Sequence, residues 1–365
     1  MQQLFEESNF KLEEVQKYLK QFDEKAQEKE LKVTKETIFQ DLTTELGKLV
    51  TAKDLLVKYK VEIDGGVAGV FTEYLQKSLE SEKDMFVRCD DKGITYLPKE
   101  GEDIDVTKFF AFGRALLMSV MQKIAVNVRL PPSFYRYILG EENEERPLKN
   151  WMCDLEMYDH QYTMSLQKLL AIEDAKTLDY EFENEKGEKL KLDNDNREDY
   201  VLLAAKNKLF NSRKKAFDAI KNGFSIPEDE GEDVVILQEL KKNLTVFTPT
   251  ELMMLMCQDE KITAEMIIKE IDFLDWGKED KTPEFFKKFL TSMEVQPISL
   301  RRFLKYISGM AAIPVGGFSK KLRIIKREGD TMSAHSCFNY IDCPEFGDYE
   351  TFSEALFNEV KNICD

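Results

Sequence analysis

The stretch that most constrains the fold is "FFAFGRALLMSVMQKIAV" at residues 109–126, which is apolar over most of its length. A helix without a continuous polar face is stable in water only when other elements cover it. The stretch therefore predicts a buried helix. In "RLPPSFYRYILG", which follows, Pro131 and Pro132 exclude continuation of that helix and allow a short new one to begin.

Other segments before residue 150 have the spacing of helices that pack through one face. Phe10, Val15, Leu19 and Phe22 form one apolar stripe among Glu and Lys residues. A second helix is expected within "IFQDLTTELGKLVTAKDLL". Gly65 and Gly66 then interrupt the pattern before a third helix begins.

The period changes from helical to alternating near residue 178. Leu178, Tyr180 and Phe182 alternate with polar residues, and the turn "NEKGE" separates them from a second alternating run, "LKL". This pattern predicts a β-hairpin. Helices are expected on both sides of it, in "YTMSLQKLLAI" and in "NREDYVLLAAKNKLF", with Asn196 as the cap of the second.

The last hundred residues mix helix-like segments ("PEFFKKFLTSM", "ISLRRFLKYISG") with short strand-like ones ("KLRIIKRE", "CFNYIDC"). The polar "QDEK" after Cys257 has the composition of a hinge. The predicted fold class is therefore α+β. A large, mostly helical first part carries a small α+β insert, and a compact α+β part follows.

Composition narrows the functional classes. The net charge of −17, from 52 basic and 69 acidic residues, argues against binding of a nucleic-acid backbone. No apolar run approaches the roughly 18 residues of a membrane span, and the acidic N-terminus lacks the features of a secretory signal. Six scattered cysteines then indicate reduced thiols and a cytoplasmic location, with a nuclear one compatible.

The segment "SAHSCFNYIDCPEF" at residues 333–346 raises a question of chemistry, because His335 lies two residues before Cys337. A structural zinc site needs four ligands with paired spacing, which His335, Cys337 and Cys343 do not have, so no metal is expected. A cysteine protease needs a histidine in contact with the thiol. In an extended strand the two side chains share one face but their β-carbons lie ~6.5–7 Å apart.

The remaining interpretation is that cysteines here are small buried hydrophobic residues. We expect this of five of them: Cys89, Cys153, Cys257, Cys343 and Cys364. Phe338 is also expected to be core, because it points opposite to Cys337 if the strand continues. Cys337 differs from the other cysteines because its neighbours fit a pattern.

The pattern resembles the signature of the HECT-type ubiquitin ligases, in which a Ser or Ala, a His, a Thr, the catalytic Cys, a Phe and an Asn follow one another. The matching residues are Ala334, His335, Ser336, Cys337, Phe338 and Asn339, followed by Pro344 and Phe346. The resemblance extends from about residue 33 to the end. Further blocks in the family's order are "IDGGVAGVF", "FGRALLMSV", "LPPSFYRYILG", "NREDYV", "KNGF", "ELMMLMC" and "FLKYISGMAAIPVGGF".

Four departures from the family's pattern stand out. Ser336 replaces the Thr before the cysteine and keeps its hydroxyl, and Thr331-Met332 replaces the usual Leu-Pro. Gly69-Val70 stands where a charged pair is usual. Asn362 replaces a Phe that in relatives helps to place the C-terminal lobe for transfer.

The resemblance implies a bilobal HECT fold. Residues 1–257 would form the N-lobe, in which a small subdomain at about 150–205 docks a ubiquitin-conjugating enzyme. Residues 258–262 would be the hinge, and residues 263–365 the C-lobe with the cysteine. The docking surface is expected among the apolar residues of the subdomain, namely Leu166, Leu169, Leu178, Tyr180 and Tyr200.

The implied activity is that of a ubiquitin transferase without a cofactor. Cys337 would take ubiquitin from the conjugating enzyme as a thioester and pass it to a lysine of a protein substrate. About a few per cent of a free cysteine is thiolate at neutral pH, so a strong general base is not essential. His335 is expected to support the reaction, and Ser336 and Asn339 to bond the thioester or fix the turn.

Two other functions stay open. A degenerate HECT-like scaffold would bind a conjugating enzyme without efficient transfer, which the altered "GGVAGV" and the tail favour. A cysteine hydrolase acting on ubiquitin-like proteins is the more distant alternative.

Overall fold

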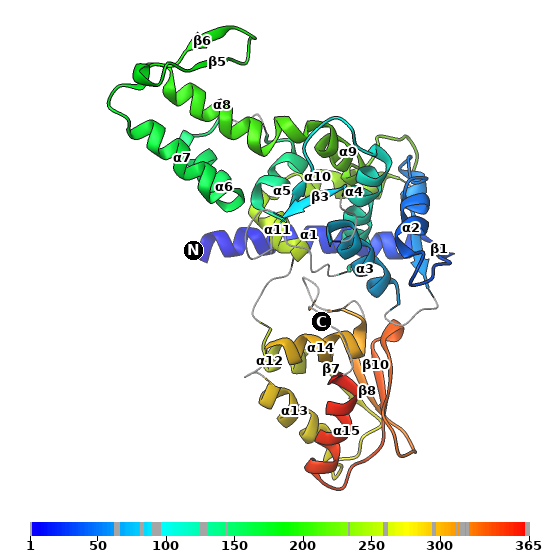
Figure 1. Cartoon of the computed structure of the whole chain (residues 1–365). Coiled ribbons are helices and arrows are strands. Elements are labelled where there is room, and N and C mark those ends of the chain that lie inside the picture. The colour runs from blue at the N-terminus through cyan, green and yellow to red at the C-terminus, as the bar shows by residue number, and fades with distance from the viewer. Residues whose placement is uncertain are drawn as a thin grey trace.

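The computed structural model describes residues 2–61, 66–80, 84–88, 96–124, 130–142, 145–232, 234–257, 262–293, 297–310, 313, 318 and 321–361. Within them the buried side chains form two separate large cores. The first runs from Val15 to Met256 and the second from Ile262 to Val360. Figure 1 shows the first as a mainly helical body and the second as a smaller body of helices and strands. The predicted α+β fold class is confirmed.

Helices dominate the first core. Besides those of the arm described below, they are α1 (Gln2–Lys25), α2 (Ile38–Leu46), α3 (Gly66–Glu80), α4 (Val106–Met121), α5 (Pro132–Leu139), α9 (Lys214–Phe224), α10 (Val235–Leu244) and α11 (Pro249–Cys257). Two short ribbons flank them. Strands β1 (Gln27–Glu30) and β2 (Val57–Lys60) pair in parallel, and β3 (Phe86–Arg88) and β4 (Tyr96–Pro98) pair antiparallel.

Helix α4 is the buried helix that the apolar run predicts. Every residue from Ala111 to Met121 is buried. The side chain of Asp105 caps its start by accepting a 3.0 Å hydrogen bond from the backbone N–H of Thr107. Helix α5 begins at Pro132 and ends at Leu139, and the φ of 84° at Gly140, which caps it, is in the left-handed region that favours glycine. Both helices are confirmed.

The backbones of α4 and α9 cross at two glycines. A β-carbon at Gly113 would stand 2.9 Å from the carbonyl carbon of Ile220, and nearer still to its oxygen. A β-carbon at Gly223 would stand 2.9 Å from the backbone nitrogen of Arg114. Real β-carbons do not come this close to backbone atoms, so each position accepts only glycine while the helices keep this distance.

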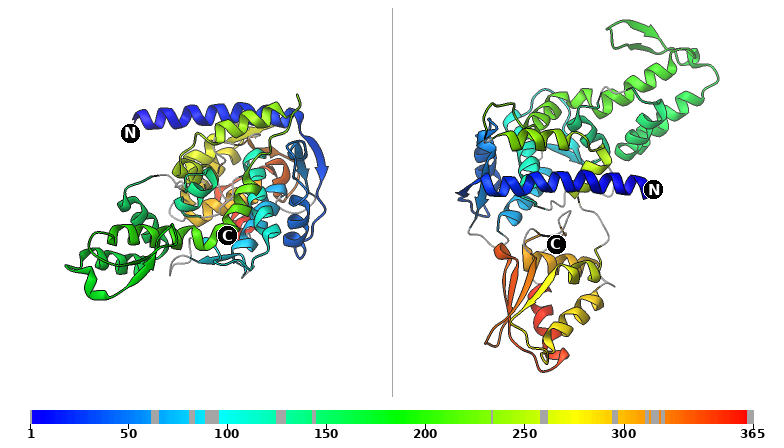
Figure 2. Two further views of the ribbon diagram at one scale, coloured as in Figure 1. Left: turned by 90° about the horizontal axis from the view of Figure 1, so that it is seen from above. Right: turned by 180° about the vertical axis from the view of Figure 1, so that it is seen from behind.

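An arm, residues 148–209, projects from the helical body (Figures 1 and 2). It consists of α6 (Leu148–Tyr158), α7 (His160–Ala171), the 3₁₀ helix η2 (Ala175–Leu178), strands β5 (Glu181–Glu183) and β6 (Lys189–Lys191), and α8 (Arg197–Leu209). The predicted hairpin and both flanking helices are confirmed. The buried residues Ala175, Phe182 and Leu192 hold the hairpin on α7 and α8 through a small core of their own.

The predicted capping role of Asn196 is wrong. Asn196 occupies the position before α8, but its side chain makes no capping hydrogen bond. Its Oδ1 instead accepts a 2.9 Å bond from the backbone N–H of Asp193, and its Nδ2 donates to the carbonyl of Lys191 at 2.8 Å. The side chain therefore closes the loop ahead of the helix.

The second core lies between three helices and a sheet. The helices are α13 (Thr282–Met293), α14 (Pro297–Ser308) and α15 (Tyr349–Lys361), with the short α12 (Ala264–Lys269) beside them. The sheet has the order β7 (Ile271–Leu274), β8 (Leu322–Lys326), β10 (Tyr340–Cys343), β9 (Ser333–His335). Strand β8 is parallel to β7 and β10, and β9 is antiparallel to β10.

Two further expectations concern the hinge and membrane-spanning helices. Residues 258–261 of the expected hinge lie outside the described residues. No helix within the described ranges has the length and apolarity that crossing a membrane requires.

Substitution Gly223→Ala tests the crossing of α4 and α9. Alanine is the better helix former by about 1 kcal/mol, but the methyl group forces the two backbones apart. We expect a net loss of about 2–4 kcal/mol in the free energy of unfolding, measured by urea denaturation. The control is Gly347→Ala, because no heavy atom lies within 4 Å of a β-carbon there. Equal effects of the two substitutions would contradict the close-contact argument.

Candidate functional site

The "AHSCFN" segment forms a tight turn between two antiparallel strands. Strand β9 ends at His335, the 3₁₀ helix η4 spans Ser336–Phe338, and β10 begins at Tyr340, which pairs with His335. Asn339 closes the turn with φ 57°, a left-handed conformation that Asn tolerates better than most residues. Alternation between the sheet faces therefore stops at His335.

Strand β8 holds this turn from the side. The backbone N–H of Arg323 donates a 2.8 Å hydrogen bond to the carbonyl of Asn339. The Arg323 Nη2 donates to the carbonyl of Phe338 at 2.9 Å. Helices α3 and α14 also contact η4, so that residues from both large cores meet at the turn (Figure 1).

The prediction that Phe338 is core is wrong, because its side chain is 61% exposed. The cause is the 3₁₀ turn, which replaces the continuous strand that the prediction assumed. Cys337 is the middle residue of η4, while its side chain lies outside what the structure describes. The backbone of the cysteine is thus at the tip of a surface turn.

His335 is held by its neighbours on the sheet. Its Nε2 lies 3.2 Å from Oδ2 of Asp342, and its ring stacks on Tyr340 with 4.5 Å between the ring centroids. The other oxygen of Asp342, Oδ1, lies 3.1 Å from Nε of Arg327. These contacts orient the imidazole without burying it, which suits a group that supports chemistry at the surface.

The other cysteines divide into two kinds. Cys343 is buried as predicted, and its thiol donates to the carbonyl of Pro344 at 3.3 Å. Cys153 is exposed on α6, so the prediction that it is buried is wrong. It lies on the face of α6 opposite the buried residues Trp151, Leu155 and Tyr158. Cys89, Cys364 and the side chain of Cys257 lie outside the described residues.

Burial alters the acid–base behaviour of Cys343. It raises the pKa of the Cys343 thiol to about 12. At neutral pH such a thiol is ionised in only about one molecule in 10⁵. Because the thiolate is the nucleophile, Cys343 is a poor candidate for covalent chemistry.

The five residues expected at a docking surface do not lie together on one face. Leu166 is only 4% exposed and belongs to the first core, so it is not available to a partner. Leu169 is half-buried between two cores, whereas Leu178 and Tyr180 are each 46% exposed.

Tyr180 and Tyr200 line a groove on the arm. Their rings meet edge to face with 5.4 Å between centroids, and Phe182 meets Tyr200 in the same way at 5.1 Å. The groove has a volume of about 450 Å³ and is also lined by Tyr162 and Leu203. Burial raises the pKa of the Tyr200 hydroxyl far above its usual value, and a hydrogen bond with Tyr180 is the second cause of this increase. Tyr200 is therefore a neutral donor or acceptor.

Sequence reasoning missed several residues of this groove. Tyr162 lies one helical turn before the predicted Leu166, and Phe182 lies in the predicted hairpin. The alternation of the hairpin indicated Phe182, and helical spacing on α7 could have indicated Tyr162.

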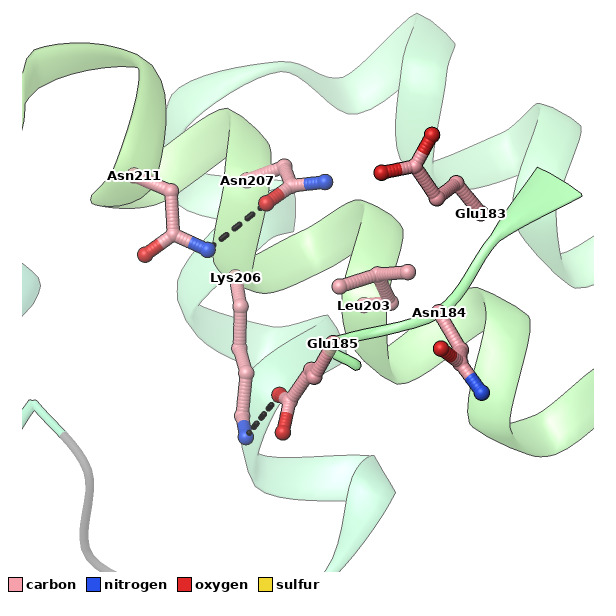
Figure 3. Close-up of a pocket in the computed structure, with 7 residues that line it drawn as sticks. All are labelled: Glu183, Asn184, Glu185, Leu203, Lys206, Asn207 and Asn211. Atoms are coloured by element: carbon pink, nitrogen blue, oxygen red, sulfur yellow. Dashed lines mark hydrogen bonds and ion pairs between the residues drawn. The ribbon is translucent and has the colours of Figure 1, made fainter. Parts of the chain in front are cut away.

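A second, more polar cavity of about 610 Å³ adjoins the groove at the end of the hairpin (Figure 3). Glu183, Leu203 and Asn207 line both cavities. The aromatic groove and the polar cavity are thus parts of one depression between the hairpin and α8.

Asn339 offers a test of the turn. A β-branched residue is strained at φ 57°, whereas glycine is not. We expect Asn339→Val to be about 1–2 kcal/mol less stable than Asn339→Gly in urea unfolding. Equal stability of the two variants would show that the left-handed residue is not required there.

A model of the family described as HECT-domain (ubiquitin-transferase) matches residues 72–363. The resemblance was expected from residue 33 onward. Some curated relatives align over about nine tenths of this chain, so the similarity to them begins nearer to residue 33 than the match to the family model does.

Three relatives illustrate the likeness. A "bifunctional serine/threonine-protein kinase/NEDD4-like E3 ubiquitin-protein ligase" of Dictyostelium discoideum is 27% identical over 71% of this chain and 13% of that protein. The "E3 ubiquitin-protein ligase RSP5" of Chaetomium thermophilum is 24% identical over 91% of this chain and 42% of that protein. The protein of the same name from Saccharomyces cerevisiae is 23% identical over 89% and 42%.

This chain therefore spans less than half the length of these relatives. The family model, by contrast, covers most of the chain, including the turn that carries Cys337. The chain belongs to the HECT-domain family of ubiquitin transferases.

Proposed function

We propose that the chain accepts ubiquitin from a ubiquitin-conjugating enzyme as a thioester on Cys337 and transfers it to a lysine of a protein substrate. The observation that carries the proposal is the place of Cys337 in η4, a surface turn inside the segment that matches the family. A protein-sized acyl donor can reach a turn of this kind, and it cannot reach a buried strand.

The reaction consists of two acyl transfers. The Cys337 thiolate attacks the carbonyl carbon of the thioester between ubiquitin and the conjugating enzyme, and the thiolate of that enzyme leaves. The unprotonated amine of the acceptor lysine then attacks the new thioester, an amide forms, and the Cys337 sulfur leaves. The proton of the amine passes to solvent. The first step exchanges one thioester for another, so it needs no cofactor to drive it.

The surroundings of the turn suit this chemistry. His335 lies two residues before the nucleophile and is oriented by Asp342 and Tyr340. A protonated imidazole near the sulfur would favour the thiolate. Ser336 and Asn339 flank the cysteine in the same turn, where their side chains support the turn or bond the thioester oxygen.

The conjugating enzyme would dock on the arm. Leu178, Tyr180 and Tyr200 supply exposed or half-exposed apolar surface beside the aromatic groove, and Leu169 packs beneath it. Aromatic side chains in such a groove contribute a large share of binding energy at protein interfaces. Leu166 is left out of this surface because it is buried.

The two cores fit a division into lobes. We assign residues 1–257 to an N-lobe, with a small subdomain at about 150–205, and residues 263–365 to a C-lobe. Residues 258–262 would be the hinge that lets the C-lobe carry Cys337 from donor to acceptor as a rigid body. The buried side chains on the two sides of this segment belong to separate clusters, which supports the assignment.

The nucleophile is tested by mixing the protein with a charged conjugating enzyme and analysing the products on a non-reducing gel. We expect a ubiquitin adduct that thiol reductant removes and that Cys337→Ala abolishes. The matched control is Cys153→Ser, which removes an exposed thiol on α6 and should leave the adduct unchanged. An adduct that survives Cys337→Ala contradicts the assignment of Cys337. Docking of the enzyme without any adduct would favour the scaffold function instead.

The docking surface is tested with an uncharged conjugating enzyme, so that only binding is measured. We expect Tyr180→Ala to weaken binding about tenfold or more, because an aromatic side chain leaves the groove. Phe357→Ala is the control, since it removes a 54% exposed ring from the surface of α15, away from the arm. Binding that Tyr180→Ala leaves unchanged in calorimetry would place the docking surface elsewhere.

A further inference from the structure

We propose that the polar cavity beside the aromatic groove is a subsite for a lysine or arginine side chain of the conjugating enzyme. The inference rests on the proposed docking of that enzyme on the arm. An apolar groove alone would require only an apolar side chain on the conjugating enzyme. The subsite adds a second requirement, namely a basic residue next to the side chain that enters the aromatic groove.

The two cavities form one binding surface. The aromatic groove and the polar cavity share Glu183, Leu203 and Asn207 as lining residues. Their volumes of about 450 and 610 Å³ each exceed the size of one side chain. A single loop of a docked protein can therefore fill both ends with neighbouring side chains.

The charges of the polar cavity are unequally compensated. Glu185 and Lys206 both line this cavity and form an ion pair at 3.0 Å, and in the adjoining groove Glu100 lies 3.5 Å from Lys208. Glu183 has no ion-pair partner within the described residues. Lys189 lies opposite Glu183 across the hairpin, but the two make no ion pair in that part of the chain. The lysines of α8 are thus engaged, and one carboxylate remains available.

An amide pair lines the cavity beside this carboxylate. Asn211 Nδ2 donates a 2.6 Å hydrogen bond to Asn207 Oδ1, so the Asn207 oxygen is already engaged. Figure 3 shows the nitrogen end of the Asn207 amide facing the Glu183 carboxylate. The Glu183 carboxylate is therefore the acceptor for a cation here, and the several N–H donors of an ammonium or guanidinium group can bond its oxygens.

The aromatic rings next to this cavity strengthen the case for a cation. Tyr180, Phe182 and Tyr200 line the adjoining groove, and Glu181 lies on its rim. The aliphatic stem of a lysine or arginine packs well on such rings while its charged end reaches a carboxylate. The surplus of negative charge on the chain, −17 overall, further favours a partner with basic residues.

The test compares two charge reversals on the arm, Glu183→Lys in the cavity and Glu173→Lys outside both cavities. Both residues are exposed, so both variants should fold. The probe is an uncharged conjugating enzyme that forms the Cys337 adduct with the wild-type chain. We expect Glu183→Lys to raise the Kd about tenfold and Glu173→Lys to change it less than twofold at the same ionic strength.

A charge exchange identifies the partner residue. Each lysine and arginine in the docking loop of the conjugating enzyme is changed to glutamate in turn. One of these variants should bind Glu183→Lys more tightly than it binds the wild-type chain. If the two charge reversals weaken binding equally, or if no variant of the conjugating enzyme restores binding to Glu183→Lys, the subsite is wrong. Docking at Tyr180 is not affected by either result. If the wild-type chain binds no conjugating enzyme, the docking proposal fails and the subsite fails with it.

Discussion

The contact between α4 and α9 is the constraint on which the rest of the helical body depends. Gly113 and Gly223 allow the two backbones to touch, and no other residue fits there without moving a helix. Helix α4 is buried along most of its length, so any shift of α9 would be felt throughout the first core. Both glycines lie in sequence blocks that resemble the HECT family, "FGRALLMSV" and "KNGF". In these two blocks the resemblance to the family reflects the close packing of α4 against α9.

The arm is fastened to this body by a buried cation. Arg213, directly before α9, donates from Nε to the carbonyl of Pro98 at 2.7 Å and lies 2.7 Å from Glu100 through Nη2. The same nitrogen donates to the Tyr158 hydroxyl at the end of α6. Because the Arg213 side chain is fully buried, each partner compensates a charge that would otherwise lack solvation. These contacts thus hold the arm, which carries the aromatic groove, against the helical body.

The proposed chemistry and the proposed docking lie on different bodies of the chain. The turn with Cys337 belongs to the sheet of the second core, whereas the aromatic groove belongs to the arm of the first. This separation explains why the turn can be small and exposed. Its conformation depends on Arg323 and on the left-handed Asn339, and binding energy for a large partner comes from elsewhere.

Local patterns in the sequence determined the helices, the hairpin and the motif around Cys337, because periodicity and turn residues act over a few positions. Burial depends on which elements cover a face, and only the tertiary structure decided it. Leu166 is covered and Cys153 is not, although both were judged by residue type. Phe338 is exposed because a 3₁₀ turn interrupts its strand. The grouping of Glu183, Asn207 and Asn211 around one cavity likewise has no local signal, since residues distant in sequence are brought together only by packing.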